Sequence, residues 1–193
     1  MQKDRKICII KLLKIVEAKL MKNQYPIGRY QIPAEYNRNI LNQWITDIEE
    51  LPYKINEIIS NIDDSFRKKQ YRNGSWDVNT LIHHIADSHL HGYIRTKLIL
   101  TEDKPKVSTF EENEWIKLAD NENDCHDSIM FLFGIHHRWS TILKELTEEQ
   151  LERVMIHPDN GEVTLKQMLS LYSWHGNHHL EHIKIALGII KGE

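Results

Sequence analysis

Residues 164–191 read TLKQMLSLYSWHGNHHLEHIKIALGIIK. The first four residues, Thr164 to Gln167, form a capping-box pattern, which marks the start of a helix. At about 100° per residue, apolar and histidine side chains recur along one side of the helix that follows. This apolar stripe comprises Met168, Tyr172, His175, His179, Ile183, Ala186 and Ile190. The stretch therefore predicts an amphipathic helix that runs to about Lys191 and buries two histidines.

Three more long helices are predicted upstream, because helical periodicity dominates the chain and strand patterns are nearly absent. We expect them at about Pro33–Ile62, Asp77–Leu100 and His126–Leu146. Pro52 should bend or break the first. Short helices are expected near Trp115 and after Thr147, and a small hairpin at the edges of the turn at 157–162. These elements predict an all-α, up-down four-helix bundle with short extra helices in its connections.

Composition places the chain among ordinary globular domains. Its 193 residues, 27% of them charged, suit one domain with one core. A net charge of −3 argues against a nucleic-acid partner, which usually meets a basic patch. No run approaches about eighteen apolar residues, so we expect no membrane-spanning segment. Cys8 and Cys125 lie far apart and in no metal-binding spacing, which fits a reducing cytoplasm.

Residues 1–22 are interpreted separately from a domain at residues 23–193. Lysines accompany an Ile- and Leu-rich run there, but Lys11 and Lys14 interrupt the apolar region that a signal peptide needs. We expect an appended helix, or a mis-assigned start with Met21 as the true initiator. A basic amphipathic helix lying on a membrane surface is the alternative. Intact-mass analysis of the natural protein would reject the mis-assigned start by finding residues 1–20 present.

Histidines gather in two segments of the chain. Residues 83–91 and 175–182 hold eight of its twelve histidines. His175 and His179 are four residues apart on the apolar stripe, so they share one helix face. Buried imidazoles need polar partners, and one ion at about 2.0–2.1 Å from each nitrogen satisfies two at once. A single buried histidine is usually a hydrogen-bonded core residue, but two in register favour a metal site.

A peptidase motif overlaps the second segment. His178 to His182 also fits the inverted zincin pattern H-x-x-E-H, in which Glu181 would be the general base. That site needs a further protein ligand, and no carboxylate-rich helix follows His182 in the sequence. We therefore treat a peptidase as the weaker interpretation.

The two histidine segments lie among aromatic and glycine positions that together carry a family resemblance. They comprise Tyr25-Pro-Ile-Gly28, Trp76, His83-His-Ile-Ala-Asp-Ser-His89, Tyr93-Ile-Arg95, Trp115, His157-Pro158 and Tyr172 to Ile183. From about residue 25 to 187 the chain resembles the YfiT branch of the DinB-like superfamily. The resemblance implies a four-helix bundle, often a homodimer, with three histidines binding one zinc or nickel ion at one end. Carried onto this chain, the ligands are His84, His175 and His179.

Periodicity alone favours a different histidine on the helix at about 77–100. Its apolar side passes through Val78, Ile82, Ile85 and His89. His84 lies off that line, yet we follow the motif and predict His84 as the ligand. His89, Asp87 and His178 are then expected beside the ligands as supporting or pocket residues. Arg95 is a candidate contact for an anionic group.

An open three-histidine site points to catalysis, because closed structural sites usually have four protein ligands. A metal there lowers the pKa of bound water to about 7, or holds a thiol as thiolate. The resemblance implies transfer of a low-molecular-weight thiol, of the bacillithiol type, to an electrophilic small molecule. We favour transfer because neither histidine-bearing helix carries an obvious carboxylate placed to act as a general base at the ligands. Metal-dependent hydrolysis is the alternative, and a non-catalytic metal- or ligand-binding stress protein is a third.

Overall fold

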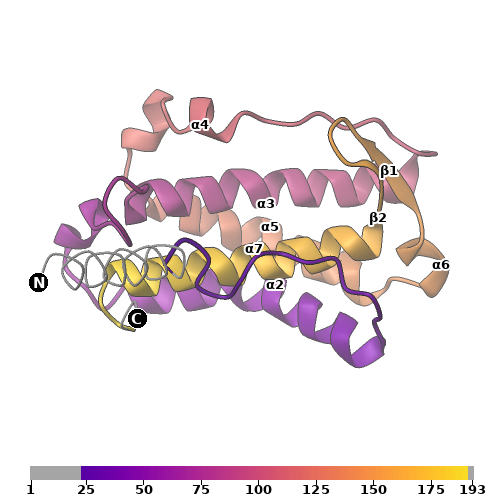
Figure 1. Cartoon of the computed structure of the whole chain (residues 1–193), viewed down its shortest axis with the longest axis horizontal. Coiled ribbons are helices and arrows are strands. Elements are labelled where there is room, and N and C mark those ends of the chain that lie inside the picture. The colour runs from indigo at the N-terminus through magenta and orange to yellow at the C-terminus, as the bar shows by residue number, and fades with distance from the viewer. Residues whose placement is uncertain (1–22, 191–193) are drawn as a thin grey trace, which may run out of the picture.

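Four long helices dominate the computed structural model, which describes residues 23–190 (Figure 1). They are α2 (Arg38–Ile59), α3 (Val78–Thr101), α5 (His126–Lys144) and α7 (Leu165–Ala186). The connections hold the short helices η1 (Asp64–Lys68), α4 (Glu112–Trp115), η2 (Ala119–Glu122) and α6 (Glu148–Leu151). A hairpin of β1 (Val154–His157) and β2 (Gly161–Thr164) precedes α7. The predicted four-helix bundle is confirmed, while the predictions for residues 1–22 lie outside the described residues.

The long helices form a ring in which α2 and α3 are diagonal, because each packs against α5 and α7. Asp47 and Leu51 of α2 meet Ser173 and Gly176 of α7 in the same order, so these helices are parallel. Helix α3 runs in the opposite direction to α7 (Figure 1), and its His84 meets His175 of α7. Two of the long helices therefore run each way. Their directions do not alternate along the chain, however, since α3 and α5 point the same way.

The segment 102–125 makes this order possible by running back along the bundle before α5 begins (Figure 1). At one end it joins the hairpin, where Val107 and Pro105 exchange backbone hydrogen bonds with Ile156. At the other end the buried amide of Asn79 donates to two carbonyls of the segment and accepts from the Cys125 N–H. These anchors hold α4 against the side of α3.

The prediction was that Pro52 bends or breaks this helix, and α2 continues through Pro52, so the helix is not broken there. Proline cannot donate to the carbonyl four residues earlier, which here belongs to Ile48. Nδ1 of His136 on α5 donates to that carbonyl instead. A side chain distant in sequence thus supplies the missing hydrogen bond within the packed bundle.

The helix α7 ends at Ala186, earlier than the predicted end near Lys191. Gly188 follows with φ of 69°, and its N–H bonds to the Ile185 carbonyl. A glycine in this left-handed conformation commonly ends a helix. The apolar pattern continues to Ile190, which is why periodicity overestimated the length.

Histidines separate two apolar clusters inside the bundle. One cluster includes Leu41, Tyr93, Trp139 and Tyr172, and the other includes Leu51, Ile82, Leu180 and Ile183. His89, His175 and His179 fall between these clusters along α3 and α7. The histidines therefore lie partway along the bundle, whereas the resemblance implied a position at one end. Within residues 23–190, no helix is both long and apolar enough to cross a membrane.

Candidate metal centre

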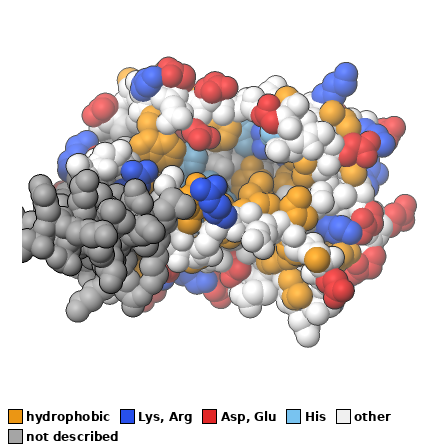
Figure 2. Space-filling view, in the orientation of Figure 1, with side chains coloured by type: hydrophobic (Ala, Val, Ile, Leu, Met, Phe, Trp, Pro, Cys, Tyr) orange, Lys and Arg blue, Asp and Glu red, His pale blue; other side chains and the backbone are white. Residues whose placement is uncertain are grey.

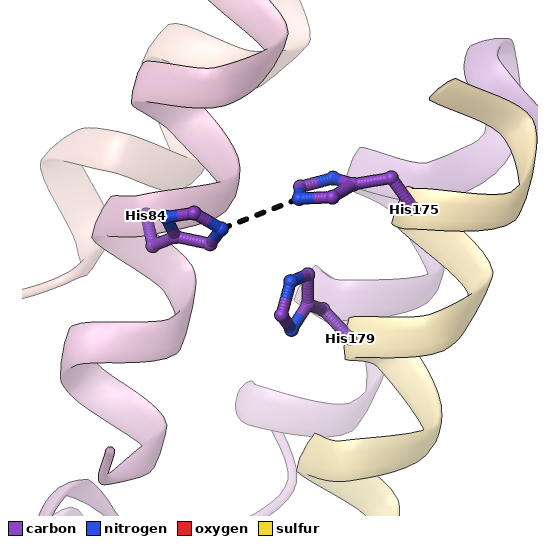
Figure 3. Close-up of side chains that lie close together, drawn as sticks. All are labelled: His84, His175 and His179. Atoms are coloured by element: carbon purple, nitrogen blue, oxygen red, sulfur yellow. Dashed lines mark hydrogen bonds between the residues drawn. The ribbon is translucent and has the colours of Figure 1, made fainter. Parts of the chain in front are cut away.

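Three histidines converge between α3 and α7 (Figure 3). The four-residue spacing of His175 and His179 places them on successive turns of one α7 face. His84 comes from the second turn of α3, which passes α7 in the opposite direction. His84 and His179 are buried and His175 is partly buried. The antiparallel pairing of these two helices therefore creates the cluster.

Their nitrogen atoms have the spacing of ligands around one ion. Nε2 of His84 and Nε2 of His175 lie 3.2 Å apart. One ring nitrogen from each of the three histidines lies within 4.8 Å of the other two. Two nitrogens bound to a tetrahedral zinc at about 2.0–2.1 Å would lie about 3.3–3.4 Å apart. The cluster is close to that arrangement.

Burial keeps these three rings neutral. It lowers the pKa of His84 to about 4. Burial also takes the pKa values of His175 and His179 well below the ordinary value, and neighbouring histidines act in the same direction. A neutral ring has one nitrogen lone pair. Nδ1 of His84 is buried and has no hydrogen-bond partner in the described part of the chain. Converging neutral imidazoles fit an ion such as zinc or nickel.

His89 supports His175 from behind. Its ring is fully buried, and its Nε2 lies 3.2 Å from Nδ1 of His175. Metal-binding histidines usually direct one nitrogen to the ion and the other to such a partner. The structure therefore places His84 at the point of convergence and His89 beside it, in the positions that the motif indicated.

A cavity of about 370 Å³ opens beside the three histidines. Aromatic rings form much of its wall, namely Trp76, Phe110, Tyr172 and Trp174. Figure 2 shows histidine surface within a hollow on this face of the molecule. His178 and Arg95 also line the cavity, as predicted for pocket residues. Arg95 is held in place there, since its Nη2 donates to the Ser108 carbonyl at 2.6 Å.

Two carboxylates considered from the sequence lie elsewhere. Asp87 is not among the residues that line the cavity. Burial raises its pKa to about 6, Asp120 adds to this rise, and His83 opposes it. Glu181, the base of the peptidase interpretation, pairs with Lys184 at 2.6 Å and does not line the cavity either. Neither residue is placed to act on a reactant at the three histidines.

Glu112 of α4 is the carboxylate that lines this cavity in the described part of the chain. Its side chain is exposed. Sequence reasoning missed Glu112, because no local pattern shows that the segment 102–125 returns across the site. Helical periodicity likewise indicated no functional role for Trp76 and Trp174, the two tryptophans of the cavity wall.

A four-helix bundle with three converging histidines defines a class of candidate metal-binding proteins. Residues 47–183 match the DinB superfamily, and the chain belongs to this family. A relative from Halalkalibacterium halodurans is 46% identical over 167 residues, covering 86% of this chain and 98% of its own. One from Oceanobacillus iheyensis is 37% identical over 163 residues, covering 84% and 95%. Both carry the name "Putative metal-dependent hydrolase".

Two solved structures share the fold. YfiT from Bacillus subtilis aligns with a TM-score of 0.81 and 36% identity, over 87% of this chain and 98% of YfiT. It is described as "a probable metal-dependent hydrolase with an unusual four-helix bundle topology". The mycothiol-dependent maleylpyruvate isomerase aligns with a TM-score of 0.59 and 16% identity, over 74% of this chain and 60% of the isomerase. The first confirms the predicted branch of the family, and the second shows a common fold.

Proposed function

We propose that this protein is a divalent-metal-dependent enzyme that transfers a low-molecular-weight thiol, of the bacillithiol type, to an electrophilic small molecule. The open set of ligands carries this proposal. His84, His175 and His179 converge beside a cavity, and no fourth His, Cys, Asp or Glu of residues 23–190 joins the group. Three protein ligands leave room for a reactant at the ion.

The residues around the cavity suit the two reactants. A bound zinc or nickel ion would supply Lewis acidity, which lowers the pKa of a thiol or water reaching it. Arg95 offers a guanidinium to an anionic group of the thiol. Trp76, Phe110 and Trp174 offer apolar surface to the electrophile. In the transfer, sulfur bonds to the electrophilic carbon, and the leaving group departs with the electron pair of its bond.

Transfer is favoured over hydrolysis because no buried carboxylate of residues 23–190 lines the cavity. A thiolate is itself the nucleophile and needs no further deprotonation. Glu112 is the carboxylate lining the cavity among the described residues, and it is exposed rather than held against the histidines. The fold shared with a mycothiol-dependent enzyme gives independent support for thiol chemistry on this scaffold.

Hydrolysis is the second candidate, and Glu112 is the observation that favours it. A carboxylate at the cavity could accept a proton from an attacking water. The names of the relatives from Halalkalibacterium halodurans and Oceanobacillus iheyensis agree with this reaction. Glu112→Gln separates the two candidates, because it should abolish hydrolysis and leave thiol transfer largely intact.

The decisive assay follows consumption of 1-chloro-2,4-dinitrobenzene by zinc- or nickel-loaded protein, with bacillithiol, cysteine or no thiol. We expect turnover that requires a thiol, releases chloride and stops with a chelator. His84→Ala and His179→Ala should fall to the rate of metal-free protein. His137→Ala, at an exposed position of α5, is the matched control and should be unaffected. Metal binding without any thiol-dependent or hydrolytic turnover would instead favour the non-catalytic binding protein.

We further propose that one zinc or nickel ion is bound per chain and that the protein is a cytoplasmic homodimer. The metal proposal follows from the imidazole ligands, which suit both ions. The dimer follows from the family resemblance. Native mass spectrometry of purified protein reports both, since it resolves the number of chains and of ions in one measurement.

A further inference from the structure

A second group of histidines lies on the next turn of α7. His178, His179 and His182 are all buried, and one ring nitrogen of each lies within 4.8 Å of the other two. They line an adjoining cavity together with Tyr71 and Arg72, and this cavity shares Glu112, His178 and His179 with the one beside the inner group. This outer group therefore shares His179 with the inner group of His84, His175 and His179.

The hydrogen bonds of His182 direct a lone pair at His179. Nε2 of His182 lies 3.3 Å from the Gln24 carbonyl, which can only accept, so the proton is on Nε2. The ring also stacks on Tyr71 with centroids 3.8 Å apart, which fixes its plane. Nδ1 of His182 therefore carries the lone pair, and it lies 3.3 Å from Nδ1 of His179.

His179 presents one nitrogen to each group. Its Nδ1 faces His182, and its other nitrogen, Nε2, is directed toward His84 and His175 (Figure 3). The Nδ1 atoms of His179 and His182 lie 3.3 Å apart, close to the 3.2 Å between the Nε2 atoms of His84 and His175. Both match the separation of about 3.3–3.4 Å between two nitrogens on one tetrahedral ion.

His178 completes the outer group. It is only 6% exposed, and its Nδ1 is buried with no hydrogen-bond partner among residues 23–190. Its ring stacks on Trp174, with centroids 4.5 Å apart and planes 17° apart. An unpartnered, oriented imidazole beside two others is unfavourable unless something binds to it.

We propose that His178, His182 and Nδ1 of His179 form a second position for a divalent cation, occupied in alternation with the inner one. A neutral imidazole has one lone pair and one N–H. With an ion at the inner position, the proton of His179 is on Nδ1 and is donated to His182. With an ion at the outer position, the proton is on Nε2. One ion per chain is therefore expected, at either position.

The proposal is tested by zinc binding alone, so it does not depend on the thiol transfer. Loss of His84 should move the ion to the outer group. Tag-free His84→Ala should therefore still bind one zinc, as measured by competition with a chromophoric chelator. His84→Ala/His178→Ala should bind at least about tenfold more weakly. His84→Ala/His137→Ala, which removes an exposed histidine, should match His84→Ala.

A second measurement uses protein loaded with cobalt in place of zinc. The visible spectrum of cobalt-loaded His84→Ala should differ from that of wild type, since the ligand sets differ. His178→Gln replaces His178→Ala if circular dichroism shows that alanine disturbs the fold. Equal zinc affinities for His84→Ala and His84→Ala/His178→Ala would overturn the outer position. Two tightly bound ions in the wild-type chain would overturn the alternation.

Discussion

Each α7 histidine of the inner group has a further histidine at its Nδ1. His89 faces Nδ1 of His175 at 3.2 Å, and His182 faces Nδ1 of His179 at 3.3 Å. A partner that accepts there keeps the proton on Nδ1 and leaves the Nε2 lone pair for an ion. Helix periodicity does not reveal these buried partners.

Loss of His89 should weaken zinc binding at the inner position by about 10–100-fold. The comparison is made in the His178→Ala background, which removes the outer position. His83→Ala is the matched control, because His83 is also buried on α3 but bonds to Ser128 and the Asn123 carbonyl. Competition with a chelator measures the zinc affinity of both variants. Equal affinities would show that His89 does not orient His175.

His136 makes stability depend on pH. Burial lowers its pKa to about 4, opposed by the hydrogen bond to the Ile48 carbonyl. In the unfolded chain the pKa is about 6.5, so between these values only the unfolded state binds the proton. The contribution of His136 to stability is complete above pH 6.5 and is lost as the pH falls toward 4. At pH 5 the loss is about 2 kcal/mol.

His136→Leu removes this titration but leaves the Ile48 carbonyl without its donor, which costs about 1–3 kcal/mol at neutral pH. We expect the difference in unfolding free energy between wild type and His136→Leu to narrow by about 2 kcal/mol from pH 7.5 to pH 5. Urea titrations with chelator present measure it. Met130→Leu, at an exposed position of the same helix, removes no titratable group and should show no narrowing. If the difference in unfolding free energy between wild type and His136→Leu stayed the same at both pH values, His136 would not be a buried neutral residue.

At the scale of the element, α7 depends on its N-terminal cap. The Thr164 side chain accepts from the Gln167 N–H, and the Gln167 side chain accepts from the Thr164 N–H. Thr164→Ala should lower the unfolding free energy by about 0.5–2 kcal/mol. Zinc stoichiometry should not change, because the ligands lie three turns further on. Thr164→Ser keeps the cap and serves as the control, with thermal unfolding as the measurement. A loss as large in Thr164→Ser would contradict the capping role.

At the scale of the whole molecule, the ring of helices depends on a close approach at Gly92 of α3. A Cβ there would lie 2.5 Å from the Trp139 ring and 2.7 Å from the Tyr172 ring. Gly92→Ala should therefore destabilise the bundle by about 1–3 kcal/mol.

Gly134 of α5 is the matched control for this packing. A Cβ there meets nothing within 4 Å, and the position is exposed. Gly134→Ala should stabilise the protein by about 0.5–1 kcal/mol through helix propensity. Denaturant titration measures the unfolding free energy of both variants. A change of the same sign in both would contradict the close approach at Gly92.

Local pattern was enough for much of the bundle. The capping boxes at Thr147 and Thr164 depend only on residues three positions apart, and both are present in the structure. The register of His175 and His179 depends only on 3.6 residues per turn. Local reasoning failed where the partner of a group lies far along the chain. At Pro52 the helix lacks one backbone donor to the Ile48 carbonyl, and His136 supplies it.

The sequence by itself determined the class of fold, the two histidine segments and the pair of imidazoles on α7, because each follows from short-range periodicity and residue chemistry. Only the tertiary structure decided between His89, which the apolar stripe of α3 favours, and His84, which the family motif favours. Nε2 of His84 lies 3.2 Å from Nε2 of His175, whereas His89 lies at Nδ1 of the same ring. Both histidines are buried, since α3 is covered by α5, α7 and η1. The parallel course of α3 and α5, and the place of Glu112, likewise depend on the path of residues 102–125. Long-range packing sets that path, and no local propensity encodes it.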